Sequence, residues 1–170
     1  MNISDFLDAD KILLHVHGTS KAEITDQLID LFADDERIRD LQKMREAVHA
    51  REGIMSTAVG NGFAIPHAKT EWVSDIVMAC GLLDKPIDFE APDGRAVELV
   101  FLVVCNEDKV SSYVQIISRI ATIMNSDGLA KRLAGAQSPE EVFDLLHKEE
   151  ERIGLCKCTR GVGADGRVSA

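Results

Sequence analysis

Two apolar runs in the middle of the chain predict buried β-strands. They span residues 76–83 and 97–105, and the second is apolar at nearly every position. Uninterrupted apolar runs of this length are typical of central strands that are covered on both faces. Residues 92–95, Pro-Asp-Gly-Arg, lie between the runs and have the composition of a turn. With a third strand-like run at 12–16, the pattern predicts a sheet in which 97–105 is the most buried strand.

Apolar residues three or four positions apart predict helices before and after these strands. Ser20 opens a capping-box pattern, and Ser138 followed by Pro139 and Glu141 marks the start of the last helix. The predicted helices cover about 21–32, 40–51, 110–124 and 129–133, and the last runs from 139 onward. This order predicts an α/β fold, a single-domain mixed β-sheet flanked by helices in a layered sandwich.

Length and composition predict one domain followed by a tail. The chain has 170 residues, which is enough for a hydrophobic core without disulfides or metals. The run Glu149-Glu150-Glu151 leads into a glycine-rich ending that cannot bury much apolar surface. We therefore expect a domain at residues 1–148 and a mobile tail at 149–170.

Charge and hydropathy narrow the class of partner. The formal net charge of −10 argues against direct nucleic-acid binding and fits docking on a more basic protein. No apolar run approaches the roughly 20 residues that span a bilayer. The start of the chain also lacks the features of a signal peptide. A cytoplasmic protein without direct membrane insertion is expected.

The four cysteines do not form the pattern of a disulfide framework. Cys80 and Cys105 lie inside apolar runs and are expected in the core. Cys156 and Cys158 form a C-x-C pair in the tail, but a metal site there would need two further ligands that the tail does not offer. No metal is expected.

The segment 56–69 carries the strongest functional signal. Gly60, Asn61 and Gly62 tolerate positive φ and favour a tight turn or a close approach of backbone to a ligand. A short strand is expected at 63–65, and Pro66 stiffens the chain before His67. An imidazole titrates near neutrality, so a large uncharged fraction of His67 is available as a nucleophile.

Residues 51–67 resemble the active-site motif of the type 2 enzyme IIA domains (mannitol, fructose and nitrogen-regulatory) of the bacterial phosphoenolpyruvate-dependent phosphotransferase system. The matching residues are Arg51-Glu52, Ser56-Thr57, Gly60-Asn61-Gly62 and Ala64-Ile65-Pro66-His67. Ala58 stands where the family usually has glycine. The resemblance extends more loosely from about Ile3 to about Lys148, and it implies that His67 accepts a phosphoryl group.

The resemblance also suggests residues that would bind this phosphoryl group. A guanidinium engages two phosphoryl oxygens at once, which makes Arg51 the candidate clamp. Ser56 and Thr57 could donate hydroxyl hydrogen bonds, and Gly60, Asn61 and Gly62 could offer backbone N–H groups. The alternative is that the glycine turn is only a hairpin and His67 only the end of a strand.

The sequence departs from the family at Tyr113. Family members commonly carry a second histidine near the start of the third predicted helix, and Tyr113 takes its place here. Its hydroxyl remains a donor, but a pKa of about 10 prevents it from shuttling protons near neutrality. The alternative is that Tyr113 is simply packed on the apolar face of this helix with its hydroxyl at the rim.

The other ring systems carry weaker signals. His15 and His17 share one face of the run 12–16. Such a pair could bind a metal ion or simply lie on a solvated strand face. The solvated face is favoured because the segment holds no acidic or thiol residue that could complete a metal site. His49 and His147 are expected on helix surfaces. Trp72 is a candidate for the apolar rim around His67, although a lone tryptophan is more often simply packed.

These features predict a phosphocarrier in which His67 takes a phosphoryl group from phospho-HPr or a paralogue of it. No metal or nucleotide cofactor is expected, since the chain has no Walker-type loop. A nitrogen-regulatory protein with a regulated target is favoured over a sugar-specific protein that passes the group to a IIB domain. Two features favour it: segment 131–138 resembles the nitrogen-regulatory type, and the sequence contains no permease or IIB segment. A phosphorylation-independent binding module is the third alternative, and a hydrolase with His67 as general base has little support.

Overall fold

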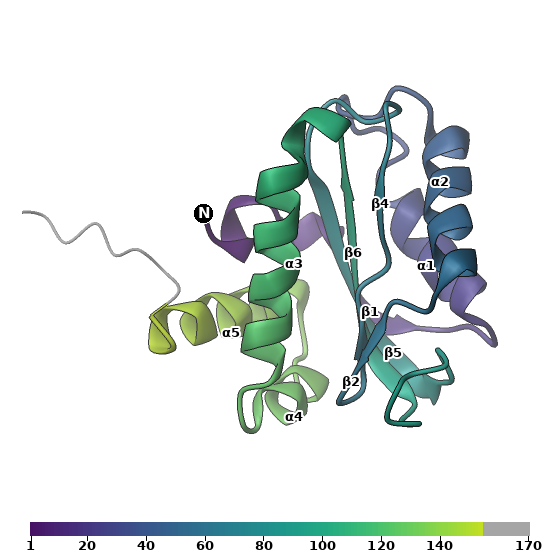
Figure 1. Cartoon of the computed structure of the whole chain (residues 1–170). Helices are drawn as coiled ribbons and strands as arrows, with labels where there is room; N and C mark the ends of the chain where they lie inside the picture. Colours follow the sequence, from purple (N-terminus) through teal and green to yellow (C-terminus); the bar gives the residue numbers. More distant parts are fainter. Residues whose placement is uncertain (155–170) are drawn as a thin grey trace, which may run out of the picture.

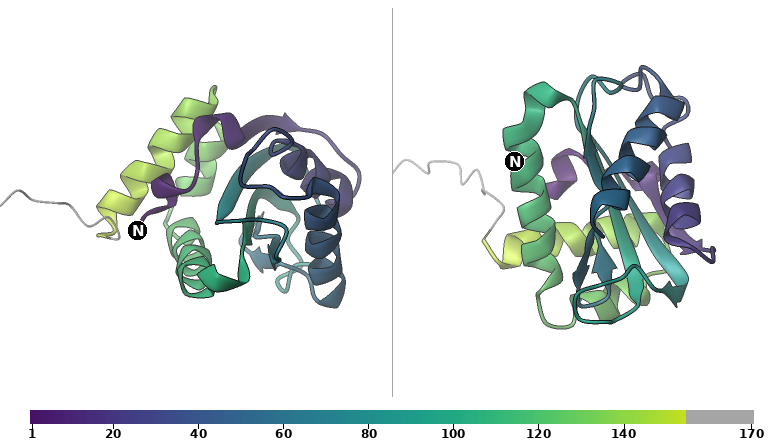
Figure 2. Two further views of the ribbon diagram at one scale, coloured as in Figure 1. Left: turned by 90° about the horizontal axis from the view of Figure 1, so that it is seen from above. Right: turned by 45° about the vertical axis from the view of Figure 1, so that its right-hand side comes forward.

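The structure is a computed structural model that describes residues 1–154. Its centre is a six-stranded mixed sheet that lies between two layers of helices (Figures 1 and 2). The strands are β1 (Ile12–Val16), β2 (Ala58–Gly60), β3 (Phe63–Ala64), β4 (His67–Lys69), β5 (Val77–Ile87) and β6 (Val97–Cys105). The layered α/β sandwich predicted from the sequence is therefore confirmed.

Strand β6 organises the sheet. It pairs with β5 in antiparallel register and with both β3 and β4 in parallel register. The order is β1-β5-β6-β3-β2, with β4 on the same edge of β6 as β3. Every residue of β6 except Glu98 is buried, as predicted for a central strand that is covered on both faces.

The helices begin where the sequence indicates. They are α1 (Lys21–Asp30), α2 (Leu41–Ile54), α3 (Val110–Met124), α4 (Leu129–Ala134) and α5 (Pro139–Arg152), with 3₁₀ turns at Ile3–Asp5, Ala9–Lys11 and Glu107–Lys109. The side chains of Ser20, Asp40 and Ser138 each accept a hydrogen bond from a backbone N–H three residues further on. These N-caps satisfy donors that have no partner inside the helix, and so they fix the helix starts.

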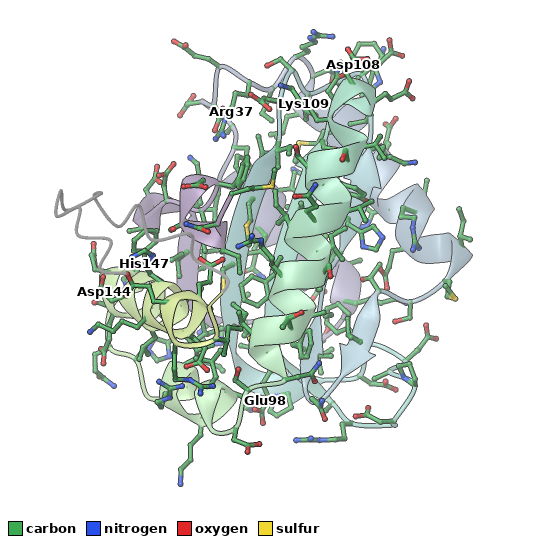
Figure 3. The ribbon with its side chains drawn as sticks, turned by 60° about the vertical axis from the view of Figure 1, so that its left-hand side comes forward. Arg37, Glu98, Asp108, Lys109, Asp144 and His147 are labelled. Atoms are coloured by element: carbon green, nitrogen blue, oxygen red, sulfur yellow. The ribbon has the colours of Figure 1, made fainter. Side chains whose placement is uncertain are left out.

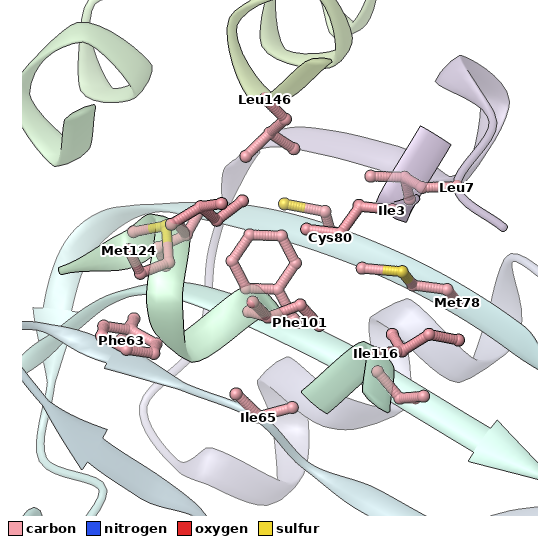
Figure 4. Packing of buried hydrophobic residues seen from close by; sticks show 14 of the residues in the cluster. Ile3, Leu7, Phe63, Ile65, Met78, Cys80, Phe101, Ile116, Met124 and Leu146 are labelled. Carbon is pink, nitrogen blue, oxygen red and sulfur yellow. The ribbon is translucent and has the colours of Figure 1, made fainter. Parts of the chain in front are cut away.

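Alternate side chains of the strands enter two separate cores. Helices α1 and α2 cover one face of the sheet, and α3, α4, α5 and the first 3₁₀ turn cover the other (Figure 2). Figure 4 shows the second core, where Phe101 and Cys80 of the sheet face Ile116 of α3 and Leu146 of α5. Cys80 and Cys105 are buried free thiols, in agreement with the expected core positions.

The last helix continues beyond the expected domain boundary at residue 148. Helix α5 ends at Arg152, and Glu149 and Glu150 within it are almost completely buried. They tolerate burial because each has partners: Glu149 pairs with Arg132 and Arg152, and Glu150 accepts the N–H of Ile3. The remainder of the expected tail, with Cys156 and Cys158, lies outside the described residues.

No helix within residues 1–154 is long and apolar enough to cross a membrane. The same residues contain no group of three or more histidine, cysteine or acidic side chains that could hold a metal ion.

Candidate functional site

His67 is the first residue of β4, at an open edge of the sheet. It lies opposite Val103 of β6, and within residues 1–154 β2 pairs with β3 alone and no strand pairs with the other edge of β4. Side chains alternate along a strand, so Ala68 enters the core beneath α1 and α2 and His67 points to the α3 side. Strand β4 lies between α2 and α3 (Figure 1), and His67 lines a cavity together with residues of both helices.

A hydrogen bond fixes which nitrogen of His67 can react. Its Nδ1 lies 2.6 Å from the carbonyl oxygen of Ile65. A carbonyl oxygen only accepts, so Nδ1 carries the hydrogen and the neutral ring keeps its lone pair on Nε2. Pro66 supports this geometry because it constrains Ile65 to an extended conformation. The local sequence therefore produces an imidazole with one defined nucleophilic atom.

The surroundings of His67 favour its neutral form. Burial is the largest effect and lowers the pKa of His67 below its ordinary value of 6.5, and the charge of Arg51 lowers it further. The Ile65 carbonyl and the Glu52 carboxylate oppose the shift without reversing it. At neutral pH, His67 is therefore predominantly uncharged.

A cavity of about 430 Å³ gives access to this ring. It is lined by Ala47, Ala50, Arg51 and Ile54 of α2, by His67, Ala68 and Lys69 of β4, and by Tyr113 of α3. The structure therefore brings together His67, Arg51 and Tyr113, the three residues that the sequence singled out as catalytic candidates. Lys69 was not predicted, although its spacing of two from His67 along a strand places both side chains on one face.

Arg51 lies in the last turn of α2, where its charge complements the helix dipole. One guanidinium nitrogen, Nη1, donates to the carbonyl oxygen of Met55 at 3.0 Å. Within residues 1–154 its other N–H groups have no hydrogen-bond partner, and Arg51 lines the cavity. The end of α2 therefore holds the Arg51 guanidinium in the same cavity as His67, with N–H groups that are available to a ligand.

Tyr113 packs against His67 from the opposite wall. The two ring centroids lie 5.8 Å apart at an interplanar angle of 63°, an edge-to-face contact. Tyr113 is 6% exposed, and burial raises the pKa of its hydroxyl well above the ordinary value of 10. The phenol is therefore a neutral group that can donate a hydrogen bond but does not exchange protons near neutrality.

The hydroxyls of Ser56 and Thr57 already have acceptors inside the protein. Thr57 Oγ1 donates to Glu52 Oε2 at 2.5 Å, and the Thr57 N–H donates to Glu52 Oε1 at 3.2 Å. Ser56 Oγ donates to the carbonyl oxygen of Phe89. The Thr57 bonds hold the loop that follows α2 against the end of that helix, and the Ser56 bond ties the same loop to the segment after β5. Glu52, to which the sequence analysis gave no role, is the acceptor that organises it.

The glycine turn lies at the other end of β6 from His67. Gly60, Asn61 and Gly62 all have positive φ and close the hairpin between β2 and β3. The carbonyl of Gly62 accepts from the N–H of Glu98, whereas His67 pairs with Val103. Glu98 and Val103 are five positions apart along β6, a distance of about 16 Å. The structure does not bring this turn to the imidazole.

Three of the remaining rings have acidic partners on neighbouring elements. His15 and His17 place Nδ1 at 2.8 and 2.9 Å from the two carboxylate oxygens of Asp84, which comes from β5 rather than from their own segment. His49 contacts Asp26 of α1 at 2.6 Å. Trp72 does not line the cavity, and the ammonium group of Lys43 lies 3.9 Å from its ring centroid.

Two sequence comparisons describe the relatives of the chain. A model of the family described as "Phosphoenolpyruvate-dependent sugar phosphotransferase system, EIIA 2" matches residues 5–149. A nitrogen regulatory protein of Pseudomonas aeruginosa is 30% identical over 146 residues, covering 86% of this chain and 95% of that protein. The fructose-specific EIIABC component of Bacillus subtilis is 28% identical over 151 residues, which are 89% of this chain but 24% of that protein.

Solved structures share the fold. Nitrogen regulatory protein IIA-Ntr from Neisseria meningitidis superimposes with a TM-score of 0.79 at 28% identity, over 85% of this chain and 98% of that one. Enzyme IIA of the mannitol system of Escherichia coli, solved in complex with phosphorylated enzyme IIB, gives a TM-score of 0.72 at 19% identity over 84% of this chain and 97% of that one.

Proposed function

Because the chain belongs to the EIIA 2 family of the phosphoenolpyruvate-dependent sugar phosphotransferase system, we propose that it is a phosphocarrier that accepts a phosphoryl group on Nε2 of His67. One observation gives the strongest support for Nε2 of His67 as the phosphoryl acceptor. The Ile65 carbonyl holds the hydrogen of His67 on Nδ1, so the lone pair of Nε2 is free in a cavity that also contains a guanidinium.

In the proposed reaction, Nε2 of His67 attacks the phosphorus of a phosphohistidine on a donor protein. The new N–P bond forms as the N–P bond of the donor breaks, and the electron pair of that bond stays on the donor imidazole. His67 transfers no proton during the attack because the reacting form is neutral. The positive charge that develops on its ring is offset by the Ile65 carbonyl, which accepts the Nδ1 hydrogen.

Arg51 is the proposed clamp on the transferring group. The phosphoryl group carries its charge on three equatorial oxygens, and stabilising them is the main task of a protein in this chemistry. The free N–H groups of the Arg51 fork suit two of these oxygens at once. Lys69 lines the same cavity and adds a second positive charge.

We assign Ser56, Thr57 and Glu52 to shaping the loop rather than to contacting phosphorus, since their hydrogen bonds are made within the protein. The turn at Gly60, Asn61 and Gly62 is left outside the proposed phosphoryl site because of its distance along β6. Tyr113 packs the imidazole and offers a neutral donor. On this proposal it does not replace the proton-exchanging role of a second histidine.

Partners would dock on an apolar surface around the cavity. Ile54 and Met55 at the end of α2 are 81% and 67% exposed, and Val114, next to Tyr113 on α3, is 56% exposed. Large apolar side chains exposed together around a polar site are typical of protein interfaces. We propose HPr or a paralogue as the donor, which also implies a cytoplasmic protein, because that is where these donors are charged.

For the recipient, we propose regulation of a target protein of the nitrogen-regulatory type. The nitrogen regulatory relative is matched over nearly its whole length, and IIA-Ntr from Neisseria meningitidis shares the fold at 28% identity. The second candidate is transfer to a IIB domain, which the fructose-specific relative and the mannitol complex favour. Transfer from the phosphorylated protein to purified IIB domains would distinguish these branches.

A passive docking module is the remaining alternative. His67→Asp places a negative charge at the site, and His67→Gln keeps a neutral polar group there. If phosphorylation is the signal, affinity for a regulated target changes with His67→Asp and not with His67→Gln. Equal target binding by both variants would favour the passive module.

The decisive experiment is intact-mass spectrometry after incubation with phosphoenolpyruvate, enzyme I and HPr. We expect one phosphoryl group on the wild type, labile in acid and stable in alkali, and none on His67→Ala. A nitrogen-branch paralogue of HPr is the second donor, and HPr charging is followed in the same spectra. The proposal is refuted if both donors are charged and neither phosphorylates the wild-type protein.

A further inference from the structure

A second cavity, of about 350 Å³, lies at the opposite end of the sheet from His67. Leu99 of β6 and Leu82 of β5 line it, and they pair with each other four residues from the pair formed by Val103 and Met78 near His67. It shares no lining residue with the cavity at His67. The two cavities are therefore separate sites on one sheet.

The floor of this second cavity is apolar and built from several elements. Leu82, Leu99, Met124 and Leu133 are each at most 8% exposed and come from β5, β6, α3 and α4. The wall at the hairpin between β2 and β3 is fixed, because the Asn61 side-chain amide donates to Asn125 Oδ1 at 2.8 Å. A cavity framed by paired strands and packed helices is formed before any ligand arrives, as is usual for small-molecule sites.

The rim of this cavity carries two carboxylates and one histidine, His15. Its charged lining residues are Asp84 and Glu98, and no lysine or arginine lines it. Asp84 is already held by His15 and His17. The Glu98 carboxylate has no hydrogen bond or ion pair within residues 1–154, and Figure 3 shows Glu98 near the end of α3. One carboxylate is thus available to a ligand above an apolar floor.

We propose that this cavity binds a small organic cation with a compact apolar body, such as an arylalkyl or alkyl amine. The apolar body would be buried against the four floor residues and the ammonium group would pair with Glu98. A phosphate or carboxylate ligand would meet two carboxylates and, among residues 1–154, no lysine or arginine. The volume lies at the small end of the range for ligand sites, about 300–1,000 Å³.

The test uses three probes of similar shape and different charge: 2-phenylethylamine, 2-phenylethanol and 3-phenylpropanoate. Methyl-labelled methionines report binding, because Met124 lies in the cavity floor and Met78 lies at the other end of the sheet. The amine should shift the Met124 methyl signal in a saturable manner and leave Met78 unchanged. The alcohol should bind more weakly, and the carboxylate should not bind.

Three exposed positions supply the variants and their control. Glu98→Gln should weaken amine binding about five-fold, the effect of one solvent-screened ion pair, and leave alcohol binding unchanged. Glu71→Gln, an exposed acid outside the cavity, is the matched control and should bind like the wild type. Ala134 is an exposed residue of the cavity wall, so the larger side chain of Ala134→Phe should fill part of the cavity and abolish binding of both the amine and the alcohol.

The proposal is overturned if the alcohol or the carboxylate binds as tightly as the amine, or if the amine does not bind. It is also overturned if Glu98→Gln does not differ from Glu71→Gln, or if Ala134→Phe still binds. None of these outcomes depends on phosphorylation of His67.

Discussion

Replacing Thr57 by valine tests whether its hydroxyl belongs to Glu52 or to the phosphoryl group. Valine has nearly the same shape but removes the donor to Glu52 Oε2 at 2.5 Å. A hydrogen bond to a charged acceptor contributes about 1.5–3 kcal/mol, and the Glu52 side chain is only 10% exposed, so about 2 kcal/mol is expected. In a domain of this size, that loss lowers the unfolding midpoint by about 4–8 °C.

Thermal unfolding and single-turnover phosphorylation should be measured on the same samples. The matched control is Thr25→Val, because Thr25 is equally buried and its hydroxyl donates to an uncharged helix carbonyl, that of Lys21. The free energy of unfolding of this control should fall by about 1 kcal/mol or less. A double-mutant cycle with Glu52→Gln should give a coupling energy of about 1 kcal/mol or more between positions 52 and 57.

The phosphorylation rate separates the two assignments. With the hydroxyl bound to Glu52, Thr57→Val should react within a few-fold of the wild-type rate at a temperature where both are folded. Removal of a donor to a transferring group typically costs about 10²–10³-fold in rate. An unchanged unfolding midpoint together with a rate loss of that size would refute our assignment.

Four further predictions concern charges at and away from the cavity. Arg51→Met should slow single-turnover phosphorylation by roughly 10²–10³-fold, and Arg51→Lys, which keeps the charge but loses the fork, should fall between it and the wild type. Because neutral His67 reacts and its pKa is lowered, the midpoint of the rate decrease at acid pH should lie below 6.5 in a stopped-flow pH profile. Arg51→Met removes a charge that lowers this pKa and should move that midpoint to higher pH. Tyr113→His adds a group that titrates near neutrality and should change this pH profile; an unchanged profile would contradict the role given to Tyr113. The pKa of Glu149 is lowered from 4.5 to about 2, chiefly by Arg152, so its contribution is complete above pH 4.5 and is lost as pH falls toward 2. Since both arginine partners are substantially exposed, Glu149→Gln should cost about 1–2 kcal/mol in urea unfolding at pH 7 and much less at pH 2.

The fold was predictable where its signals are local. The caps at Ser20, Asp40 and Ser138 act within four residues, so the helix starts follow from the sequence alone. The end of β5 does not follow from the sequence alone. The strand continues past the apolar run to Ile87, because Ile87 pairs with Val97 across a register shift. That pairing depends on a partner strand, and no pattern within residues 84–87 encodes it.

The site was predictable in its reacting residues and not in its supporting contacts. The motif resemblance pointed to Arg51, His67 and Tyr113, which come from three elements and line one cavity. It could not indicate which acceptor lies nearest to Ser56 or Thr57, because Glu52 and Phe89 reach those hydroxyls only in the folded chain. The glycine turn lies close to His67 in sequence. In an extended chain, however, two residues only four positions apart already lie more than about 10 Å from each other.

The cavity that gives access to His67 opens between the end of α2 and the start of α3. On the proposed function, the protein that delivers the phosphoryl group and the protein that reads or receives it must occupy the same opening in turn. We therefore expect no ternary assembly around the imidazole, and charging and discharging should follow ping-pong kinetics. A target that stays bound would protect His67 from both reactions, and the phosphorylation state of that bound fraction would then persist until the target dissociates.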